Sequence, residues 1–548
     1  MSTSIFKTTR TYLNSRSLLA NATFFFLSFL LIACGGGGSS STGSNAGSST
    51  ASVRPYNVWQ NPYMSPNPGN NIHNDSYLSD SYNFAGPSKQ GQATVTLADI
   101  ATYNDPATGQ SITIVLGECA SIAFDADGNI QSVCAGLPAG PNTTSTTRYV
   151  VTVDRNTLGL LAIFSFQKPV NSNQEGVDFG GAGYFYQDKQ YRMVVALPDG
   201  TVQVLRRTKS TAGGIDSYTS DATYNITGTG GAVTVPNSSL YAVVPDKVGN
   251  IWFTTANGVV GTITTAGVIR WLNLNDASSN PGTSGLEAIA NSHSIDQGDT
   301  TDGASGVYIL STYKIYRFGA SSNGTPSIVW NAAYDRGTGM KSGQASWGSG
   351  SSPTIFNMNN RRFVTIADNA KYMNVNVYRT EATLGSGEQR LFAQVTPFGQ
   401  NALVSDENSL IVAANADGSS IDIYAENNYG NDSITSTLGS LVTQPGFARM
   451  NLTPSGAFTV ASVNNTISVP SIVSKVSLVS NIIYTYNKTA DGWYITGLDA
   501  TDLNKVIFTN KTGDGLIRYN NYYSGISIGS DGTIWIGVTY GLMKISIN

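Results

Sequence analysis

The sequence predicts an all-β protein built from repeated four-stranded units, on three observations. After the N-terminal region, no segment keeps apolar residues at the i, i+3, i+4 spacing of a helix. Short runs of β-branched and aromatic residues recur instead, separated by Gly, Asn and Asp. These runs group into units of roughly 45–60 residues with about four strands each. The pattern is typical of a β-propeller of about eight blades, although a count of about seven would also fit.

Composition restricts the classes of function. The chain has 548 residues and a net charge of −4, and only 12% of its residues are charged. This fraction is about half of the roughly 25% found in average soluble domains. The sequence has no basic runs, which excludes nucleic acid as a partner, because phosphate binding needs clustered Lys and Arg. Two His and three Cys leave little material for metal or nucleophile chemistry.

The first 33 residues have the pattern of an export signal. Lys7, Arg10 and Arg16 give a positive start, and an apolar run follows over residues 24–33. That run is too short to span a bilayer, which takes about 20 apolar residues. It ends in Leu-Ile-Ala-Cys, with the cysteine at Cys34. These four residues resemble the lipobox of bacterial lipoproteins; the alternative is an ordinary cleaved signal with an incidental Cys.

The lipobox resemblance implies how the chain is anchored. Residues 1–33 would be the signal peptide, and Cys34 would begin the mature chain and carry the lipid, including palmitate. The Gly- and Ser-rich residues 34–55 are expected to form a flexible tether. By the same resemblance, Gly35 rather than Asp after the cysteine implies the outer membrane of a bacterial cell envelope. Which side of that membrane the protein faces stays open.

The blades can be placed along the chain. Residues 56–92 form an N-terminal extension in which the segment around His73 could cross the ring and plug one mouth. The propeller domain is expected over residues 93–548, beginning with a strand at Ala93–Thr102. Blade units then begin near Cys119, Gly183, Leu240, His293, Ser352, Asn408 and Ser471. A final three-stranded piece, Ser524–Ile547, would be completed by the strand at Ala93, which closes the ring and leaves no open edge.

Cys119 and Cys134 are expected to form a disulfide. An exported chain with two remaining cysteines favours one bond in an oxidising compartment. The two residues flank Asp125–Asn129, which reads as a hairpin turn and would bring them side by side on neighbouring strands. Two buried free thiols are the alternative. The turn also looks like half of a calcium loop, but it lacks the spacing and terminal Glu of an EF-hand.

Two repeats carry a family resemblance. Ile251-Trp252-Phe253 and Ile534-Trp535-Ile536 each follow an Asp- and Gly-containing turn. They resemble repeats of the two-component-regulator, NHL and lactonase-type propellers. Longer stretches resemble exported bacterial propeller lipoproteins of uncharacterised function; they start at His73, Gly183, Asp335, Ala367, Glu426 and Tyr519. The resemblance implies the architecture and no particular activity. Quinoprotein dehydrogenases also have eight blades, but the sequence has no adjacent Cys pair for a quinone site.

Acidic and amide residues recur where the loops between blades should open on one face. The predicted ligand-binding residues are Asp368, Asn369, Glu426, Asn427, Asn428 and Asn520. Their oxygens could ligate Ca²⁺ or hydrogen-bond the hydroxyls of a sugar or lactone. Alternatively, Asn and Asp occupy these loops because they cap turns.

His293, at the start of an innermost strand, is the candidate general base. It could equally be a structural residue. A Ser–His–Asp triad is not supported, because the sequence lacks nucleophile-elbow spacing.

Two functions remain open from the sequence. The first is a membrane-anchored propeller that binds a protein or glycan partner, or acts as a scaffold. The second is a hydrolase or lyase for a lactone or sugar-like substrate, with a divalent metal in the central channel. The scarcity of His and the absence of a catalytic motif favour the binding function. The recurrent carboxylates and amides are the reason that the enzymatic function stays open.

Overall fold

The regular structure of the described residues is almost entirely β-sheet. The computed structural model describes residues 53–67, 69–104, 110–136, 147–167, 182–210, 214–298 and 305–548. Cys34, the predicted signal peptide and nearly all of the predicted tether lie outside these residues. Within the described ranges, one short 3-10 helix, Ile517–Tyr519, interrupts the strands. Among the described residues, no helix has the length and apolar character needed to cross a bilayer.

Five sheets have four strands each. The first two, in chain order, contain β12 (Leu240–Pro245), β13 (Ile251–Thr255), β14 (Val259–Ile263) and β15 (Ile269–Asn273), then β16 (Ser294–Ile295), β17 (Val307–Leu310), β18 (Lys314–Ala320) and β19 (Pro326–Ala333). The next two contain β20 (Thr354–Met358), β21 (Arg361–Ala367), β22 (Val375–Arg379) and β23 (Leu391–Val395), then β24 (Ile411–Ala414), β25 (Ile421–Glu426), β26 (Phe447–Leu452) and β27 (Phe458–Asn464). The fifth joins β32 (Ile526–Ile528), β33 (Ile534–Val538) and β34 (Gly541–Ile547) to β2 (Ala93–Ala98).

A nine-stranded sheet contains two further blades and a hairpin. Its first blade comprises the second half of β4 (Ser111–Phe124), β5 (Ile130–Gly136), β6 (Thr147–Val153) and β7 (Leu160–Gln167). Its second blade comprises β8 (Tyr186–Gln187), β9 (Met193–Ala196), β10 (Thr201–Thr208) and β11 (Asp216–Asn225). The outer strands β7 and β11 pair in parallel, which merges the two blades into one sheet. The hairpin is formed by β3 (Ile100–Asn104) and the first half of β4.

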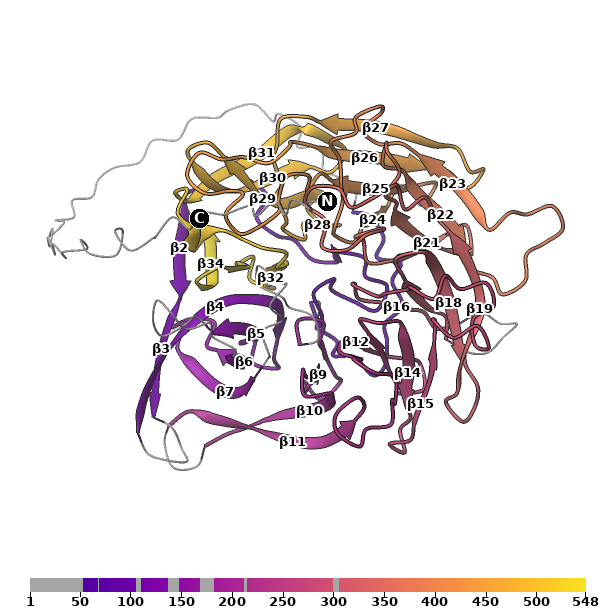
Figure 1. Cartoon of the computed structure of the whole chain (residues 1–548). Coiled ribbons are helices and arrows are strands. Elements are labelled where there is room, and N and C mark those ends of the chain that lie inside the picture. Colours follow the sequence, from indigo (N-terminus) through magenta and orange to yellow (C-terminus); the bar gives the residue numbers. More distant parts are fainter. Residues whose placement is uncertain are drawn as a thin grey trace, which may run out of the picture. The chain divides into compact units, whose positions relative to one another are not determined.

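The remaining blade, which precedes the C-terminal one, belongs to a five-stranded sheet. It contains β28 (Lys475–Ser477), β29 (Ile482–Thr489), β30 (Gly492–Asp499) and β31 (Asp502–Gly513). The short strand β1 (Ser81–Tyr82) pairs in parallel with β28, its innermost strand. The sheets therefore make eight four-stranded blades, which follow one another around a common centre (Figure 1).

The N-terminal strand completes the C-terminal blade as predicted. β2 pairs antiparallel with β34, from Ala93 opposite Ile547 to Ala98 opposite Leu542. The predicted strand Ala93–Thr102 is in fact two strands, β2 and β3, separated at Asp99. The break has a physical cause: β2 hydrogen-bonds to β34 whereas β3 pairs with β4, so the chain changes partners between them.

The two tryptophans of the repeats occupy equivalent positions, as predicted. Trp252 lies on β13 and Trp535 on β33, the second strand of each blade counted from the centre. Both are almost fully buried. Trp252 packs on Phe318 of the following blade, with ring centroids 6.4 Å apart, and Trp535 belongs to the apolar cluster of β4 and β5. Each ring therefore fills the space between neighbouring blades.

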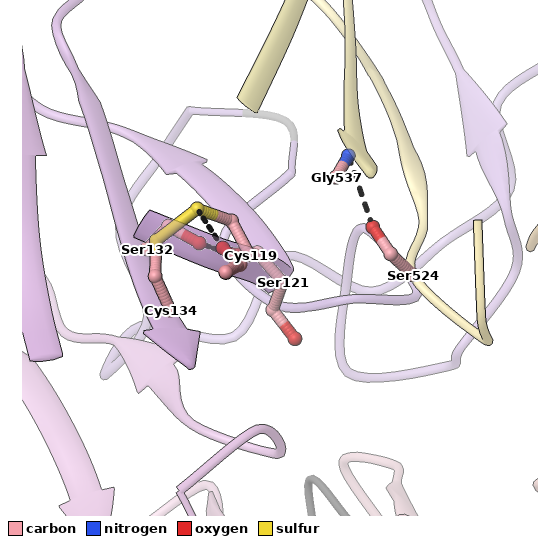
Figure 2. The surroundings of a disulfide bond; sticks show 7 residues. Cys119, Ser121, Ser132, Cys134, Ser524 and Gly537 are labelled. Carbon is pink, nitrogen blue, oxygen red and sulfur yellow. Dashed lines mark hydrogen bonds between the residues drawn. A yellow bond between two sulfur atoms is a disulfide. The ribbon is translucent and has the colours of Figure 1, made fainter. Parts of the chain in front are cut away.

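The predicted disulfide is present in the first blade. Cys119 and Cys134 face each other across β4 and β5, and their sulfurs are bonded (Figure 2). The Ser132 hydroxyl donates to the Ser121 carbonyl at 2.5 Å in the same pair of strands. On the adjacent last blade, the Gly537 amide donates to the Ser524 hydroxyl at 3.1 Å.

The two faces of the propeller differ in their connections. One face carries the turns between first and second strands and between third and fourth strands; we call it the turn face. These turns are short, as at Asp246–Asn250, where Gly249 adopts φ +89°, a conformation that favours glycine. The other face carries the links between second and third strands and between consecutive blades. Several of those links are long, and four of them hydrogen-bond to one another: residues 334–353, 396–410, 427–446 and 514–525. We call these four loops the roof.

Candidate functional site

The centre of the propeller is filled by residues 54–84, which precede the first blade and which we call the channel segment. Figure 1 shows this stretch, in indigo, passing among the innermost strands. Its described backbone exchanges hydrogen bonds with innermost strands of five blades, at Gln187, Ile295, Ile355, Val412 and Val476. Most of its residues from 69 to 82 are buried. Protein groups, rather than an open channel, therefore occupy the axis at these strands.

A buried ion pair fastens the channel segment to the ring. Lys475 Nζ donates to a carboxylate oxygen of Asp80 and, at 2.5 Å, to the Ile72 carbonyl. The Asp80 and Lys475 side chains are both fully buried. Nδ1 of His73 lies 3.3 Å from each Asp80 oxygen and 2.7 Å from the Ser409 hydroxyl. Because Ser409 and Asp80 share one ring nitrogen, this group lacks the two-sided relay of a catalytic triad.

Burial and charge set the protonation states of this group. Burial lowers the pKa of His73 and of Lys475. Burial alone would raise the pKa of Asp80, but Lys475 and His73 lower it overall. Asp80 is thus held as a carboxylate, which matches a structural ion pair.

His293, the candidate general base, is completely buried just before β16. Neither ring nitrogen has a hydrogen-bond partner among the described residues. Burial lowers its pKa to about 3, so the ring is neutral at physiological pH. A general base must reach its substrate, and this ring has no contact with solvent. The catalytic role of His293 stays a prediction.

Asp368 and Asn369 lie in the loop after β21. The Asp368 carboxylate accepts hydrogen bonds from the Ala370 and Asn374 amides and from the side chains of Asn374 and Asn376. The Asn369 side chain donates to the carbonyls of Arg336 and Gly339 in the roof. Asp368 therefore organises its own loop, whereas Asn369 holds a roof loop in place.

Glu426 is at the centre of a buried polar cluster at the end of β25. Its carboxyl accepts from Asn408 Nδ2 at 2.9 Å and from the Ser474 amide at 3.2 Å. Asp406, which the sequence analysis missed, accepts from the Glu426 amide at 3.1 Å. Burial raises the pKa of Glu426 to about 7. Burial, reinforced by the charge of Glu426, raises the pKa of Asp406 well above its usual range.

Asn427 and Asn428 connect roof loops through their amide groups. The Asn427 side chain donates to the carbonyls of Leu403 and Pro445, and its oxygen accepts from the Ser405 and Tyr429 amides. The Asn428 side chain accepts from the Glu407 amide at 2.8 Å and donates to the Val469 carbonyl at 3.1 Å.

Asn520 makes similar contacts across the roof. Its side chain donates to the Ile434 carbonyl at 2.7 Å and accepts from the Thr437 hydroxyl at 3.0 Å. Close by in sequence, the Tyr522 amide donates to the Glu118 carboxyl at 2.6 Å. Glu118 is fully buried, and its second oxygen has no partner among the described residues. Burial raises its pKa well above the usual range.

Further hydrogen bonds join the four loops of the roof into one layer. The Ser342 hydroxyl donates to Asp432 at 2.8 Å, and the Ser405 hydroxyl donates to the Ser342 carbonyl at 3.0 Å. The Gly439 amide donates to the Gly515 carbonyl at 2.9 Å. The Tyr523 hydroxyl donates to the Gly343 carbonyl at 2.6 Å, which links the last of the four loops to the first. The predicted ligand residues on these loops are therefore embedded in one continuous structure.

The outer surface of the roof exposes large apolar side chains. They are Met340, Trp347, Leu403, Leu441, Val442 and Leu516, with exposed fractions from 39% to 58%. The Arg336 guanidinium lies 3.8 Å from the ring centroid of Tyr313 and 3.9 Å from that of Trp347. Apolar side chains gain nothing in folding from exposure to water, so several of them on one layer of loops make this layer a candidate for contact with another molecule.

The geometry limits what the predicted site can do. Its six ligand candidates are buried and already hydrogen-bonded to protein groups. Within the described ranges, no group of three or more His, Cys, Asp or Glu side chains is placed to hold a metal ion. The ligand-binding role and the proposed Ca²⁺ stay predictions. Sequence reasoning missed the exposed roof residues, although a Trp in the Gly- and Ser-rich run around Trp347 was a usable signal.

Comparisons with known proteins place few limits on function. No family model matches the chain. An uncharacterized protein of Archaeoglobus fulgidus is 21% identical over 275 residues, 47% of this chain and 52% of that protein. The chain thus spans about half the length of this curated relative.

Solved structures with similar folds are more distant in sequence. The Dos1 propeller has a TM-score of 0.47 at 10% identity, covering 83% of this chain and 94% of its own. Chaetomium thermophilum Sqt1, bound to the N-terminus of ribosomal protein L10, has a TM-score of 0.47 at 11% identity, covering 83% and 100%. A streptogramin B lyase has a TM-score of 0.34 at 12% identity, covering 83% and 98%. The strand order described above, rather than these likenesses, establishes the propeller fold.

Proposed function

We propose that this protein is an exported, lipid-anchored propeller that binds a partner protein on its roof. The observation that carries the proposal is the layer of four hydrogen-bonded loops with large apolar side chains on its outer surface. Trp, Tyr, Met and Arg are enriched in protein interfaces relative to the rest of the surface. Trp347, Tyr313, Met340 and Arg336 supply this set on two adjoining loops.

The roof is also rigid enough to serve as a binding surface. Its loops are held both by side chains buried beneath them, such as Asn427 and Asn520, and by exposed contacts such as Ser342 with Asp432. A partner would therefore meet an ordered surface and lose little entropy in organising it. A glycan is the less suitable partner for this face, because the large apolar side chains exposed on it are mainly aliphatic.

Because the channel segment fills the axis of the propeller, a binding function has better support than catalysis in the central channel. A hydrolase or lyase with a metal in the channel would need open space and free ligands on the axis. The channel segment occupies that place, and the carboxylates nearest to it accept hydrogen bonds from protein groups. The enzymatic alternative therefore has less support than a binding function.

The proposal also includes attachment of the protein to a membrane. A lipid on Cys34 would attach the propeller to the outer membrane through the tether. Labelled fatty acid should enter the wild-type protein and not the Cys34→Ser variant. Labelling of that variant would contradict the anchoring part of the proposal.

Site-specific photo-crosslinking in the producing cell tests the binding surface. A photoreactive residue replaces Met340 or Leu441 on the roof, or Leu391 or Val460 on outer strands with similar exposure. We expect one discrete adduct from the roof positions and none from the outer strands. Equal adducts from all four positions, or none at all, would contradict the proposal. One bound divalent ion per purified protein would instead support the metal-dependent alternative.

A further inference from the structure

A second candidate site lies on the turn face, where the last blade meets the first. It is a cavity of about 460 Å³, within the roughly 300–1,000 Å³ of ligand pockets. The cavity is lined by turns of both blades, residues 124–128 and 528–531, and by residues 66, 67, 83 and 84 of the channel segment. The cavity is therefore on the face opposite the roof. The first blade, the last blade and the channel segment all contribute to its lining.

The floor of this cavity is apolar and partly aromatic. Phe84, Phe124, Ile528 and Trp535 line it. Phe84 is half-buried, whereas Trp535 is 2% exposed and is fixed between the blades. The ring of Phe84 also packs on Tyr82, with centroids 4.9 Å apart, which holds it in place. The floor therefore offers a stable apolar surface on which a flat molecule can lie.

The rim of the cavity carries polar groups of both charges. Asp127, Asp531 and Arg155 line it together with the exposed Asn83. Arg155 and Asp531 are 3.6 Å apart with side chains 38% and 46% exposed, and Asp127 pairs only loosely, at 4.0 Å, with Lys209. Such exposed pairs contribute little to stability. These groups are therefore available to a ligand at small cost.

Charge indicates the chemical class of the ligand. The Asp125 carboxylate already accepts hydrogen bonds from an amide of its own turn and, at 2.8 Å, from the Arg207 guanidinium. Among the remaining lining charges, Arg155 faces Asp531, and Asp127 lies 4.0 Å from Lys209, which is outside the lining. A strongly charged ligand would gain little from charges that are already paired. Carboxylate, guanidinium and amide groups above an apolar floor instead suit a neutral molecule with hydroxyls on its edge and an apolar face.

We propose that this cavity, which we call the seam site, binds one or two rings of a neutral oligosaccharide. One face of the sugar ring would lie on Phe84, and its hydroxyls would hydrogen-bond Asp531, Asp127 and Arg155. The seam site is independent of the roof, so a protein on the roof and a glycan at the seam could bind together.

Saturation-transfer NMR on the full mature chain tests the proposal. The probes are neutral di- to tetrasaccharides of glucose, galactose, mannose and N-acetylglucosamine, with spermidine as a cationic probe. We expect saturation of the ring protons of at least one saccharide, and a loss of its affinity of at least tenfold in Phe84→Ala and in Asp531→Ala. Ser530→Trp should also abolish binding, because Ser530 lines the cavity and is exposed, so the larger side chain would fill the space a ligand needs.

Asp417→Ala is the matched control. Asp417 accepts the amide of the residue two positions later, Ser419, as Asp531 does with Thr533, but it belongs to a turn of another blade. This variant should bind the saccharide as the wild type does. Binding of no saccharide, binding of spermidine alone, or equal binding by wild type and Ser530→Trp would overturn the proposal. Thermal midpoints of all variants distinguish loss of binding from loss of folding.

Discussion

Carboxylates at the turns of one face and beneath the roof of the other accept hydrogen bonds from different kinds of partner. On the turn face, Asp125, Asp188 and Asp246 each accept the amides two and four residues later in their own turn. Beneath the roof, Asp406 and Glu426 accept from groups on other strands and loops. The first set shapes a local turn, whereas the second set joins distant parts of the chain. The same residue types therefore mark local structure at these turns and long-range assembly beneath the roof, whereas Asp368, on the roof side, caps its own loop.

The largest effect should come from the buried ion pair that holds the channel segment. Lys475→Met leaves Asp80 buried without its cation, which should cost about 3–5 kcal/mol of unfolding free energy. Chemical denaturation measures this loss. Lys505→Met is the control, because Lys505 is 63% exposed and pairs with Asp499 at the surface; it should change stability by less than about 1 kcal/mol. Equal losses in both variants would show that the channel segment depends on no long-range charge pair.

Glu426, a buried carboxyl that contacts distant parts of the chain, should make the free energy of unfolding depend on pH. Burial raises the pKa of Glu426 from 4.5 to about 7. The folded protein therefore holds a proton that the unfolded chain releases at lower pH. The resulting stability is fully present below about pH 4.5 and is lost as the pH rises through about 7. The loss is on the order of 1.4 kcal/mol for each pKa unit.

Glu426→Gln should flatten this decrease between about pH 4.5 and 7, measured by thermal unfolding at a series of pH values. Asp417→Asn, on an exposed turn, should leave the decrease unchanged. A wild-type protein whose stability is level over this range would contradict the assignment of Glu426 as a protonated group.

The disulfide is a covalent link between two neighbouring strands, β4 and β5. Replacing Cys119 and Cys134 together by Ser should lower the unfolding free energy by about 2–3 kcal/mol, since 15 residues separate them. Reduction of the wild-type protein should give a similar loss, and reduction of the double variant should give none. A double variant as stable as the oxidised protein would show that the bond adds no stability to this hairpin.

The smallest effect belongs to a turn carboxylate. Asp246→Ala removes acceptors for the Val248 and Asn250 amides and for Trp252 Nε1, the last at 3.1 Å. We expect a loss of about 1–2 kcal/mol, with no change in the pH dependence. Asp246→Asn, which keeps an acceptor oxygen, should lose less. A loss as large as that of Lys475→Met would remove the distinction between the two faces.

Much of the architecture followed from the sequence. The period of strands and turns predicted eight blades that begin close to the observed innermost strands, for example Leu240 at the start of β12. The pairing of Ala93 with the last blade and the equivalent places of Trp252 and Trp535 were also predictable. These features depend on local patterns, since side chains alternate along a strand and Asp-Gly turns connect adjacent strands.

The sequence by itself determined where the strands and turns lie, which cysteines pair, and which loops carry polar side chains. Only the tertiary structure decided what those side chains contact. Nothing around Asp80 in the sequence indicates that it meets Lys475 across 395 residues, or that Glu426 lies against Ser474. The physical reason is that burial and hydrogen bonding are properties of the assembled blades. A carboxylate at a strand end is a ligand, a turn cap or a buried link depending on which distant groups the packed sheets bring to it.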